Sequence, residues 1–90
     1  MKKFVIERDL PGVGAMSSNE LGGAAKQSNG ALAQLAPKVQ WQHSYVAGDK
    51  TFCIYLAESE DDVHRHSELS GFPATKVTEV VATIDPTTAR

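Results

Sequence analysis

The densest group of chemically capable side chains lies in the stretch QHSYVAGDKTFCIY, residues 42–55. It holds an imidazole at His43, the single thiol of the chain at Cys53, and the phenols of Tyr45 and Tyr55. Imidazole and thiolate are ligands for borderline divalent metals such as nickel, copper and zinc. Each residue also has an ordinary structural use, because tyrosine and cysteine pack well in small domains. Whether the four side chains meet depends on how the stretch folds.

The two remaining histidines lie in VHRHSELSGFP, residues 63–73. On a helix, residues i and i+2 point about 200° apart, so His64 and His66 cannot hold one metal ion together. His66 lies between Val63 and Leu69 around the helix and is expected to face inward. It is either a core histidine with a satisfied ring nitrogen or part of a buried site. His64 is expected to face outward.

Six segments would position these side chains. Residues 3–9 and 75–84 have the β-branched and apolar composition of strands, and 39–47 and 50–58 form two strands around the turn Gly48–Asp49. Residues 17–37 have helical periodicity and begin with the capping-box spacing of Ser17 and Glu20. A second helix begins after Ser59 and ends at Gly71.

The order of these elements is β-α-β-β-α-β. Two right-handed βαβ crossovers that share a central hairpin give a ferredoxin-like fold. We therefore expect an α+β structure in which residues 1–90 form one domain, with a four-stranded antiparallel sheet and both helices on one of its faces.

The hairpin has two possible registers. In the first, a two-residue loop at Gly48–Asp49 places Ser44 opposite Cys53 and His43 opposite Ile54. Alternation then turns three ring-bearing side chains toward the helices: Trp41, His43 and Tyr45. Burial favours this register, because the other one would turn two glutamines and a serine toward the helices.

The second register adds one residue to the loop, as a glycine bulge does. His43 then lies opposite Tyr55, and Tyr45 lies opposite Cys53. All four side chains gather on the face without helices, and Glu7 lies nearby on the adjoining strand. This register predicts a cluster of metal-ligating side chains.

The face of the sheet that no helix covers should carry apolar side chains. Alternation assigns Phe4 and Ile6 to the helix-covered face, together with Phe52, Ile54 and Leu56. The open face would then hold the alternate residues of the same strands: Val5, Glu7, Cys53, Tyr55, Val77, Glu79 and Val81. An apolar patch of this kind favours a homodimer that pairs through the open face.

The composition argues against nucleic acid and membranes as partners. The net charge is −2 and both signs are scattered, so no basic stripe exists for nucleic acid. The apolar run at residues 4–6 is too short for a secretory signal, and no segment has the length of a membrane span. A lone cysteine excludes an internal disulfide, and we therefore expect a cytoplasmic protein.

Three segments carry a family resemblance: FVIERDLPG, WQHSYVAGDKTFCIYLAESEDDVHRHSELSGFPATKVTEV and IDPTTA. They resemble a bacterial family of small uncharacterised proteins with a ferredoxin-like fold, one studied member of which is a nickel-binding dimer. The resemblance covers nearly the whole chain apart from residues 14–38. It implies the fold, the homodimer and a divalent-metal role.

The resemblance also points to individual residues. His43, Tyr45, Cys53 and Tyr55 match the hairpin pattern of the family, and Glu7 matches its first-strand motif. In the second helix, the family has an arginine-glutamate-histidine-alanine run where this chain reads HRHS at residues 64–67. Only the histidine at position 66 matches, so the acidic neighbour is absent.

Three hypotheses follow. The first is a small dimeric protein that binds nickel or another divalent transition metal, with His43 and His66 as nitrogen ligands and Cys53 and Glu7 as further candidates. The second is an enzyme of the dimeric α+β-barrel kind, with a small aromatic substrate between helices and sheet. Trp41, Tyr45 and Tyr55 would bind this substrate, and His43 would act as the base.

The third hypothesis is a structural or regulatory interaction domain whose histidines serve packing alone. The chain contains no nucleophile motif, glycine-rich phosphate loop or HExxH sequence. The enzyme hypothesis therefore depends on a sizeable apolar cavity on the helix side. The metal hypothesis depends on which side chains share a face.

Overall fold

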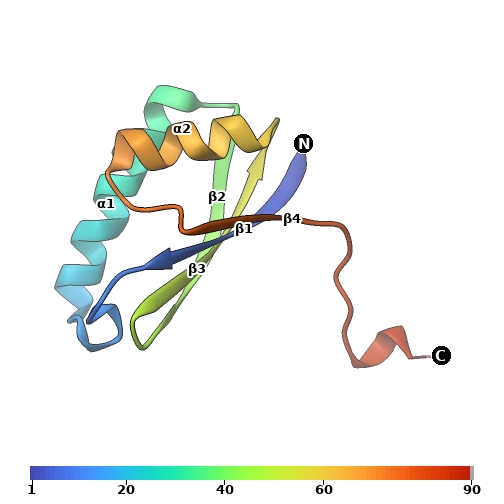
Figure 1. Ribbon diagram of the computed structural model, residues 1–90, viewed down its shortest axis with the longest axis horizontal. Helices are drawn as coiled ribbons and strands as arrows, with labels where there is room; N and C mark the ends of the chain where they lie inside the picture. The colour runs from blue at the N-terminus through green and yellow to red at the C-terminus, as the bar shows by residue number, and fades with distance from the viewer. Residues whose placement is uncertain (90) are drawn as a thin grey trace.

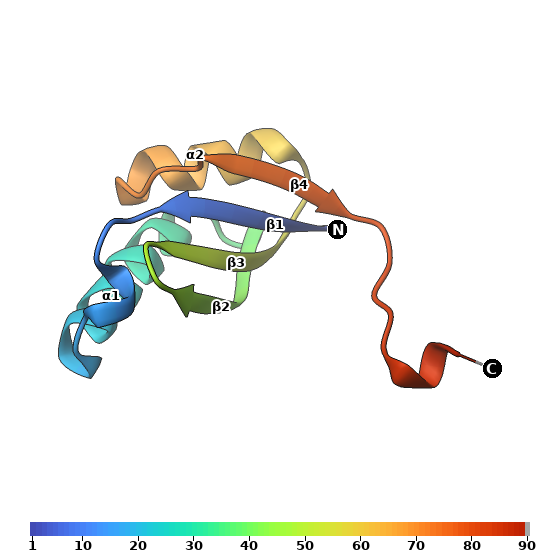
Figure 2. The ribbon, with the colours of Figure 1, turned by 60° about the horizontal axis from the view of Figure 1, so that its bottom comes forward.

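The computed structural model describes residues 1–89 and has the ferredoxin-like fold expected from the sequence (Figure 1). Four antiparallel strands form one sheet in the order β2-β3-β1-β4. The strands are β1 (Lys2–Asp9), β2 (Val39–Ala47), β3 (Lys50–Ala57) and β4 (Lys76–Val80). Helices α1 (Ser18–Leu35) and α2 (Glu60–Ser70) lie on the same side of the sheet (Figure 2).

The helix boundaries follow the predicted caps. The Oγ of Ser17 accepts the backbone N–H of Glu20 at 3.2 Å, and the Glu20 carboxylate accepts the N–H of Ser17 at 3.0 Å, which completes a capping box. Ser59 caps α2 through the N–H of Asp62, and Gly71 ends it with φ of 80°. Two short 3-10 helices, η1 (Val13–Ala15) and η2 (Pro86–Thr88), complete the element order.

Strand β4 is shorter than the sequence predicted. It ends at Val80, which pairs with Lys3, whereas residues 75–84 were expected to be extended in the sheet. The partner strand β1 begins at Lys2, so residues beyond Val80 have almost no backbone left to pair with. Residues 81–89 leave the sheet as an arm that extends away from the body (Figure 1).

The two faces of β3 are the reverse of the prediction. Tyr55 pairs with Phe4 and Cys53 with Ile6, so both lie on the helix-covered face and are buried. Both alternate sets of β3 are apolar, and hydrophobicity therefore does not decide which set faces the core. In the structure, the set on the open face is Phe52, Ile54 and Leu56.

Val77 also differs from the expectation, because it pairs with Ile6 and packs against the core under the helices. The open face of β4 carries Thr78 and Val80, which pair with Val5 and Lys3. Glu79 pairs with Phe4 and therefore lies on the helix-covered face rather than the open face.

A bulge in β2 explains the remaining difference. His43 pairs with Ile54 and Ser44 with Cys53, as the first register predicts, but Trp41 pairs with Tyr55. The extra residue between Trp41 and His43 puts these two side chains on opposite faces. The prediction that Trp41, His43 and Tyr45 share the helix-covered face is therefore wrong, and so is the alternative His–Tyr–Cys–Tyr cluster.

Candidate functional site

The four predicted metal ligands are divided between the two faces of the sheet. His43 and Glu7 belong to the open face, whereas Cys53 and His66 are buried under the helices. Within residues 1–89, no three His, Cys, Asp or Glu side chains come close enough together to hold a metal ion. One subunit by itself therefore does not bring the predicted ligands to a single ion.

His43 is exposed on the open face and has an aromatic neighbour. Its ring and that of Tyr45 form a T-shaped pair, with ring centroids 5.1 Å apart and an interplanar angle of 81°. The two rings border a depression of about 240 Å³, whose other walls are Lys3, Ile54, Val80 and Thr83. The imidazole is accessible and sits in a recess rather than on a flat surface.

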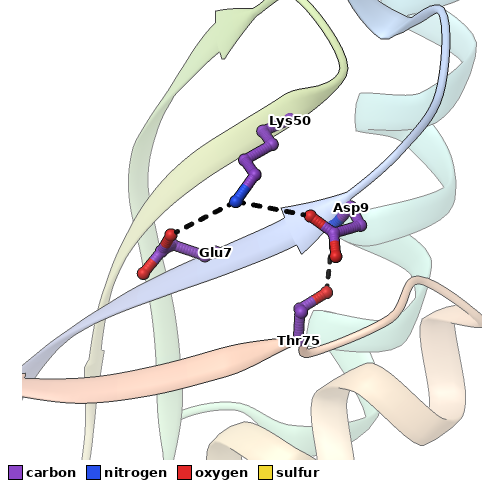
Figure 3. Close-up of polar contacts among 4 residues, drawn as sticks. All are labelled: Glu7, Asp9, Lys50 and Thr75. Carbon is purple, nitrogen blue, oxygen red and sulfur yellow. Dashed lines mark hydrogen bonds and ion pairs between the residues drawn. The ribbon is translucent and has the colours of Figure 1, made fainter.

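Glu7 is held in a small ionic group at one end of the open face (Figure 3). The Lys50 Nζ lies 3.8 Å from the carboxylate of Glu7 and 3.6 Å from that of Asp9. The backbone N–H of Asp9 donates to Thr75 Oγ1 at 3.0 Å. Since these charges are partly exposed, each ion pair contributes about 0–1 kcal/mol. A divalent cation could therefore displace Lys50 from Glu7.

The helix side contains a second polar group, here called the buried polar cluster: Arg8, Ser28, Tyr55 and His66. Arg8 extends from β1 and is only 2% exposed. Its Nη1 donates to Ser67 Oγ at 3.0 Å and to two backbone carbonyls, those of Phe72 at 3.2 Å and Pro73 at 2.9 Å. These bonds tie β1 to the end of α2 and the loop that follows it.

His66 faces inward, as the sequence predicted, and is fully buried. Its Nδ1 lies 3.5 Å from Arg8 Nη2, and its Nε2 lies 3.2 Å from Ser28 Oγ. Because a guanidinium only donates, Nδ1 accepts and Nε2 carries the proton. Burial, reinforced by the charge of Arg8, lowers the pKa of His66 to about 4. The imidazole is neutral at physiological pH, and its lone pair points at a cation.

Tyr55 and Trp41 line a cavity between α1 and the sheet. Their rings stack with centroids 6.5 Å apart, and burial raises the pKa of the Tyr55 phenol. The cavity has a volume of about 220 Å³ and mainly apolar walls. An apolar cavity of the kind that the enzyme hypothesis requires is therefore present on the helix side, and Trp41 and Tyr55 lie in its wall.

Two residues of that hypothesis are absent from the cavity wall. Tyr45 and the proposed base His43 lie on the opposite face of the sheet. The bulge after Trp41 adds one residue to β2 and so exchanges the faces to which the later side chains point. Cys53 does line the cavity, and its Sγ lies 3.5 Å from Thr51 Oγ1.

Sequence reasoning missed Arg8 and Ser28. The signal for Arg8 was available, because it follows Phe4 and Ile6 at alternate positions of β1 and therefore had to point under the helices. Ser28 gave no sign of a polar partner in the sequence, since its partners His66 and Tyr55 come from α2 and β3.

Comparison with known proteins shows the family of the chain. The family described as "Nickel responsive protein SCO4226-like" matches residues 4–80. The chain belongs to the SCO4226-like family. No curated protein matches it closely enough to be informative.

The crystal structure of SCO4226 from Streptomyces coelicolor A3(2) is similar in fold to this SCO4226-like chain. The two share 20% sequence identity and superpose with a TM-score of 0.74, over 91% of this chain and 99% of the other. At that identity the likeness concerns the fold. In residues 1–89, no helix combines the length and apolar character that crossing a membrane requires.

Proposed function

We propose that this chain is a nickel-binding protein that functions as a homodimer, with two subunits paired through the open face of the sheet and the metal held beside His43. The observation that carries the proposal is the position of His43, an exposed imidazole in a recess of an apolar face. The description of the family as nickel responsive supports the choice of metal.

The open face has the character of an interface. Half-buried apolar side chains run along its strands: Val5, Phe52, Ile54, Leu56 and Val80. Tyr45 at the edge of the sheet is 60% exposed. Removal of such a surface from water is the main driving force of protein association. A second copy is the partner that is always present, and a twofold axis makes the same patch fit itself.

A twofold axis would also bring more metal ligands to one site. One subunit offers a single imidazole on this face, whereas a dimer offers His43 twice. Glu7 lies on the same face and could add carboxylate oxygens if the metal displaced Lys50. Nickel accepts this combination of nitrogen and oxygen ligands.

The other two candidate ligands fit the proposed site less well. Cys53 and His66 lie under the helices, on the far side of the sheet from His43. The lone pair of His66 also faces the Arg8 guanidinium, which would repel a divalent cation. We therefore propose a site that uses His43 and Glu7 without them.

The test is isothermal calorimetry with NiCl₂, combined with native mass spectrometry with and without a chelator. The His43→Ala variant is expected to lose nickel binding. The matched control is His64→Ala, because His64 is also an exposed imidazole and lies on α2, where its Nε2 is 3.2 Å from the Glu60 carboxylate.

Each result has a defined meaning. Loss of binding in the His43 variant and retention in the His64 variant support the proposed site. Unchanged nickel affinity in the His43 variant contradicts it. A wild-type protein that stays monomeric at all concentrations, with or without nickel, contradicts the dimer.

A further inference from the structure

We propose that the cavity between α1 and the sheet binds a small, mainly apolar carboxylic acid, whose carboxylate pairs with the guanidinium of Arg8. This site is separate from the proposed nickel site, because the two lie on opposite faces of the sheet. The inference therefore does not depend on the nickel proposal.

The first observation is the charge of Arg8. The side chain lines the cavity and is 2% exposed. All its hydrogen-bond acceptors are neutral: Ser67 Oγ, His66 Nδ1 and the carbonyls of Phe72 and Pro73. None of the ion pairs found in residues 1–89 includes Arg8. A buried cation without a counter-charge costs several kcal/mol, and a bound anion would remove that cost.

The second observation is the edge of the guanidinium that remains free. Nη1 has two protons and already has three acceptors. Among the described residues, Nη2 has one hydrogen-bond acceptor, His66 Nδ1 at the long distance of 3.5 Å, and Nε has none, while the Arg8 Cζ lies 6.0 Å from the centroid of the Tyr55 ring. The Nε–Nη2 edge can therefore take a carboxylate with two parallel hydrogen bonds, which is the geometry that arginine prefers.

The third observation is an excess of donors in the buried polar cluster, where the Arg8 guanidinium contacts His66 and the Tyr55 ring. His66 Nε2–H donates to Ser28 Oγ, and the hydroxyls of Ser28 and Tyr55 lie 3.4 Å apart. Only one of these two hydroxyl protons can lie between the oxygens. The other has no acceptor in the part of the chain that the structure describes. The polar end of the cavity thus lacks an acceptor, and a carboxylate supplies one.

The size and walls of the cavity define the rest of the ligand. The side chains of Ala24, Ala25 and Ser28 on α1 are small, and they leave a space of about 220 Å³. Beyond the polar end, the walls are mainly apolar: Leu10, Val13, Leu21, Ala24, Trp41 and Phe72. A cavity of about 150 Å³ accommodates a benzene ring, so this one has room for a ring with a carboxylate. Val46, which is 43% exposed, also lines the cavity.

Benzoate is a suitable probe, and Trp41 is a built-in reporter because it lines the cavity and is the single tryptophan of the chain. Benzoate is expected to change the fluorescence of Trp41 saturably in the presence of a chelator. Benzamide has the same shape without the charge, and it should bind about tenfold more weakly, the effect of one lost charge-assisted hydrogen bond.

Three variants separate the contributions of charge and space. Arg8→Met keeps the aliphatic stem and is expected to lose the preference for benzoate over benzamide. Ala25→Leu fills the cavity from α1 and should abolish the binding of both probes. Ala33→Leu makes the same change on the exposed side of the same helix and should bind like the wild type.

The proposal is overturned if benzoate produces no saturable change in the wild type, or if benzamide binds as tightly as benzoate. It is also overturned if Ala25→Leu still binds benzoate. These three results are informative even if Arg8→Met fails to fold. Binding that persists with the chelator present and in His43→Ala separates this site from the nickel site.

Discussion

At the scale of single residues, the most unusual environment belongs to His66. It is a neutral imidazole with no exposed surface, and both ring nitrogens have hydrogen-bond partners. The groups that face it are Arg8 from β1, Tyr55 from β3 and Ser28 from α1. Serine does not titrate, and burial raises the pKa of Tyr55, so His66 dominates the behaviour of this cluster between pH 4 and 7.

The buried His66 predicts a pH dependence of stability. Its pKa is about 4 in the folded protein, against an ordinary value of 6.5. Between these values the unfolded chain binds a proton that the folded chain does not, so the free energy of unfolding decreases as the pH falls. The expected loss between pH 7 and pH 4 is up to about 3 kcal/mol.

Urea denaturation at several pH values measures this effect. The informative quantity is the difference between wild type and His66→Gln, since the two proteins share every other titratable group. The wild type should show the steeper loss of stability below about pH 6.5. Parallel pH profiles for the two proteins would contradict the assignment.

At the scale of elements, the contact that shapes the cavity is between the β1–α1 loop and the turn of the β2–β3 hairpin. The N–H of Leu10 donates to the carbonyl of Asp49 at 2.8 Å, and the N–H of Gly14 donates to the carbonyl of Gly48 at 2.7 Å. The side chain of Asp49 accepts the N–H of Gly12 at 2.8 Å. The loop thereby fixes Leu10 and Val13 at one end of the cavity.

Gly14 is required by this close approach. A Cβ at position 14 would lie 2.8 Å from the carbonyl oxygen of Gly48 and 2.9 Å from its nitrogen, and both are backbone atoms that cannot move aside easily. Gly14→Ala is therefore expected to lower the free energy of unfolding by about 1–3 kcal/mol. Gly23→Ala is the matched control, because a Cβ there meets nothing within 4 Å on an exposed helix position.

The control should have the opposite sign. Alanine in the middle of a helix is about 0.5–1 kcal/mol more favourable than glycine, so Gly23→Ala should raise stability. Thermal and urea denaturation of both variants measure the contrast. If both substitutions changed the free energy of unfolding equally, the close approach of Gly14 to Gly48 would not contribute to stability.

At the scale of the whole molecule, the dominant feature is the difference between the two faces of the sheet. Two helices cover one face (Figure 2). The other face presents apolar side chains, and no helix of residues 1–89 covers it. The arm that follows β4 is also apolar in part, since Val81 is 90% exposed and Ile84 is 79% exposed. Both features support our proposal of a homodimer.

A charge placed at the centre of the open face tests this proposal. Ile54 pairs with Val5 on one side and His43 on the other, so Ile54→Lys is expected to convert the dimer to a monomer. Leu69→Lys introduces the same charge at an apolar residue of α2 that is 38% exposed, and it should leave the dimer intact. Light scattering after gel filtration measures the molar mass of each protein. A wild-type mass that Ile54→Lys does not change would contradict the proposed interface.

Much of the fold could be predicted from local signals. The capping box at Ser17, the turn at Gly48–Asp49 and the stop at Gly71 each act within a few residues, and all are confirmed in the structure. The orientation of the strands was less predictable. Both alternate sets of β3 are apolar, and the bulge in β2 leaves no signature in the composition of the strand.

The sequence by itself therefore determined the elements, their order and the ferredoxin-like topology, because caps, turns and hydrophobic periodicity are encoded by residues close together in the chain. Only the tertiary structure decided which side chains share a face, and so separated His43 and Glu7 from Cys53 and His66. The same packing placed Arg8, which has no ion-pair partner in residues 1–89, beside a cavity. These outcomes depend on the register between strands and on the small residues of α1, and such long-range choices are made by the packing of the whole chain.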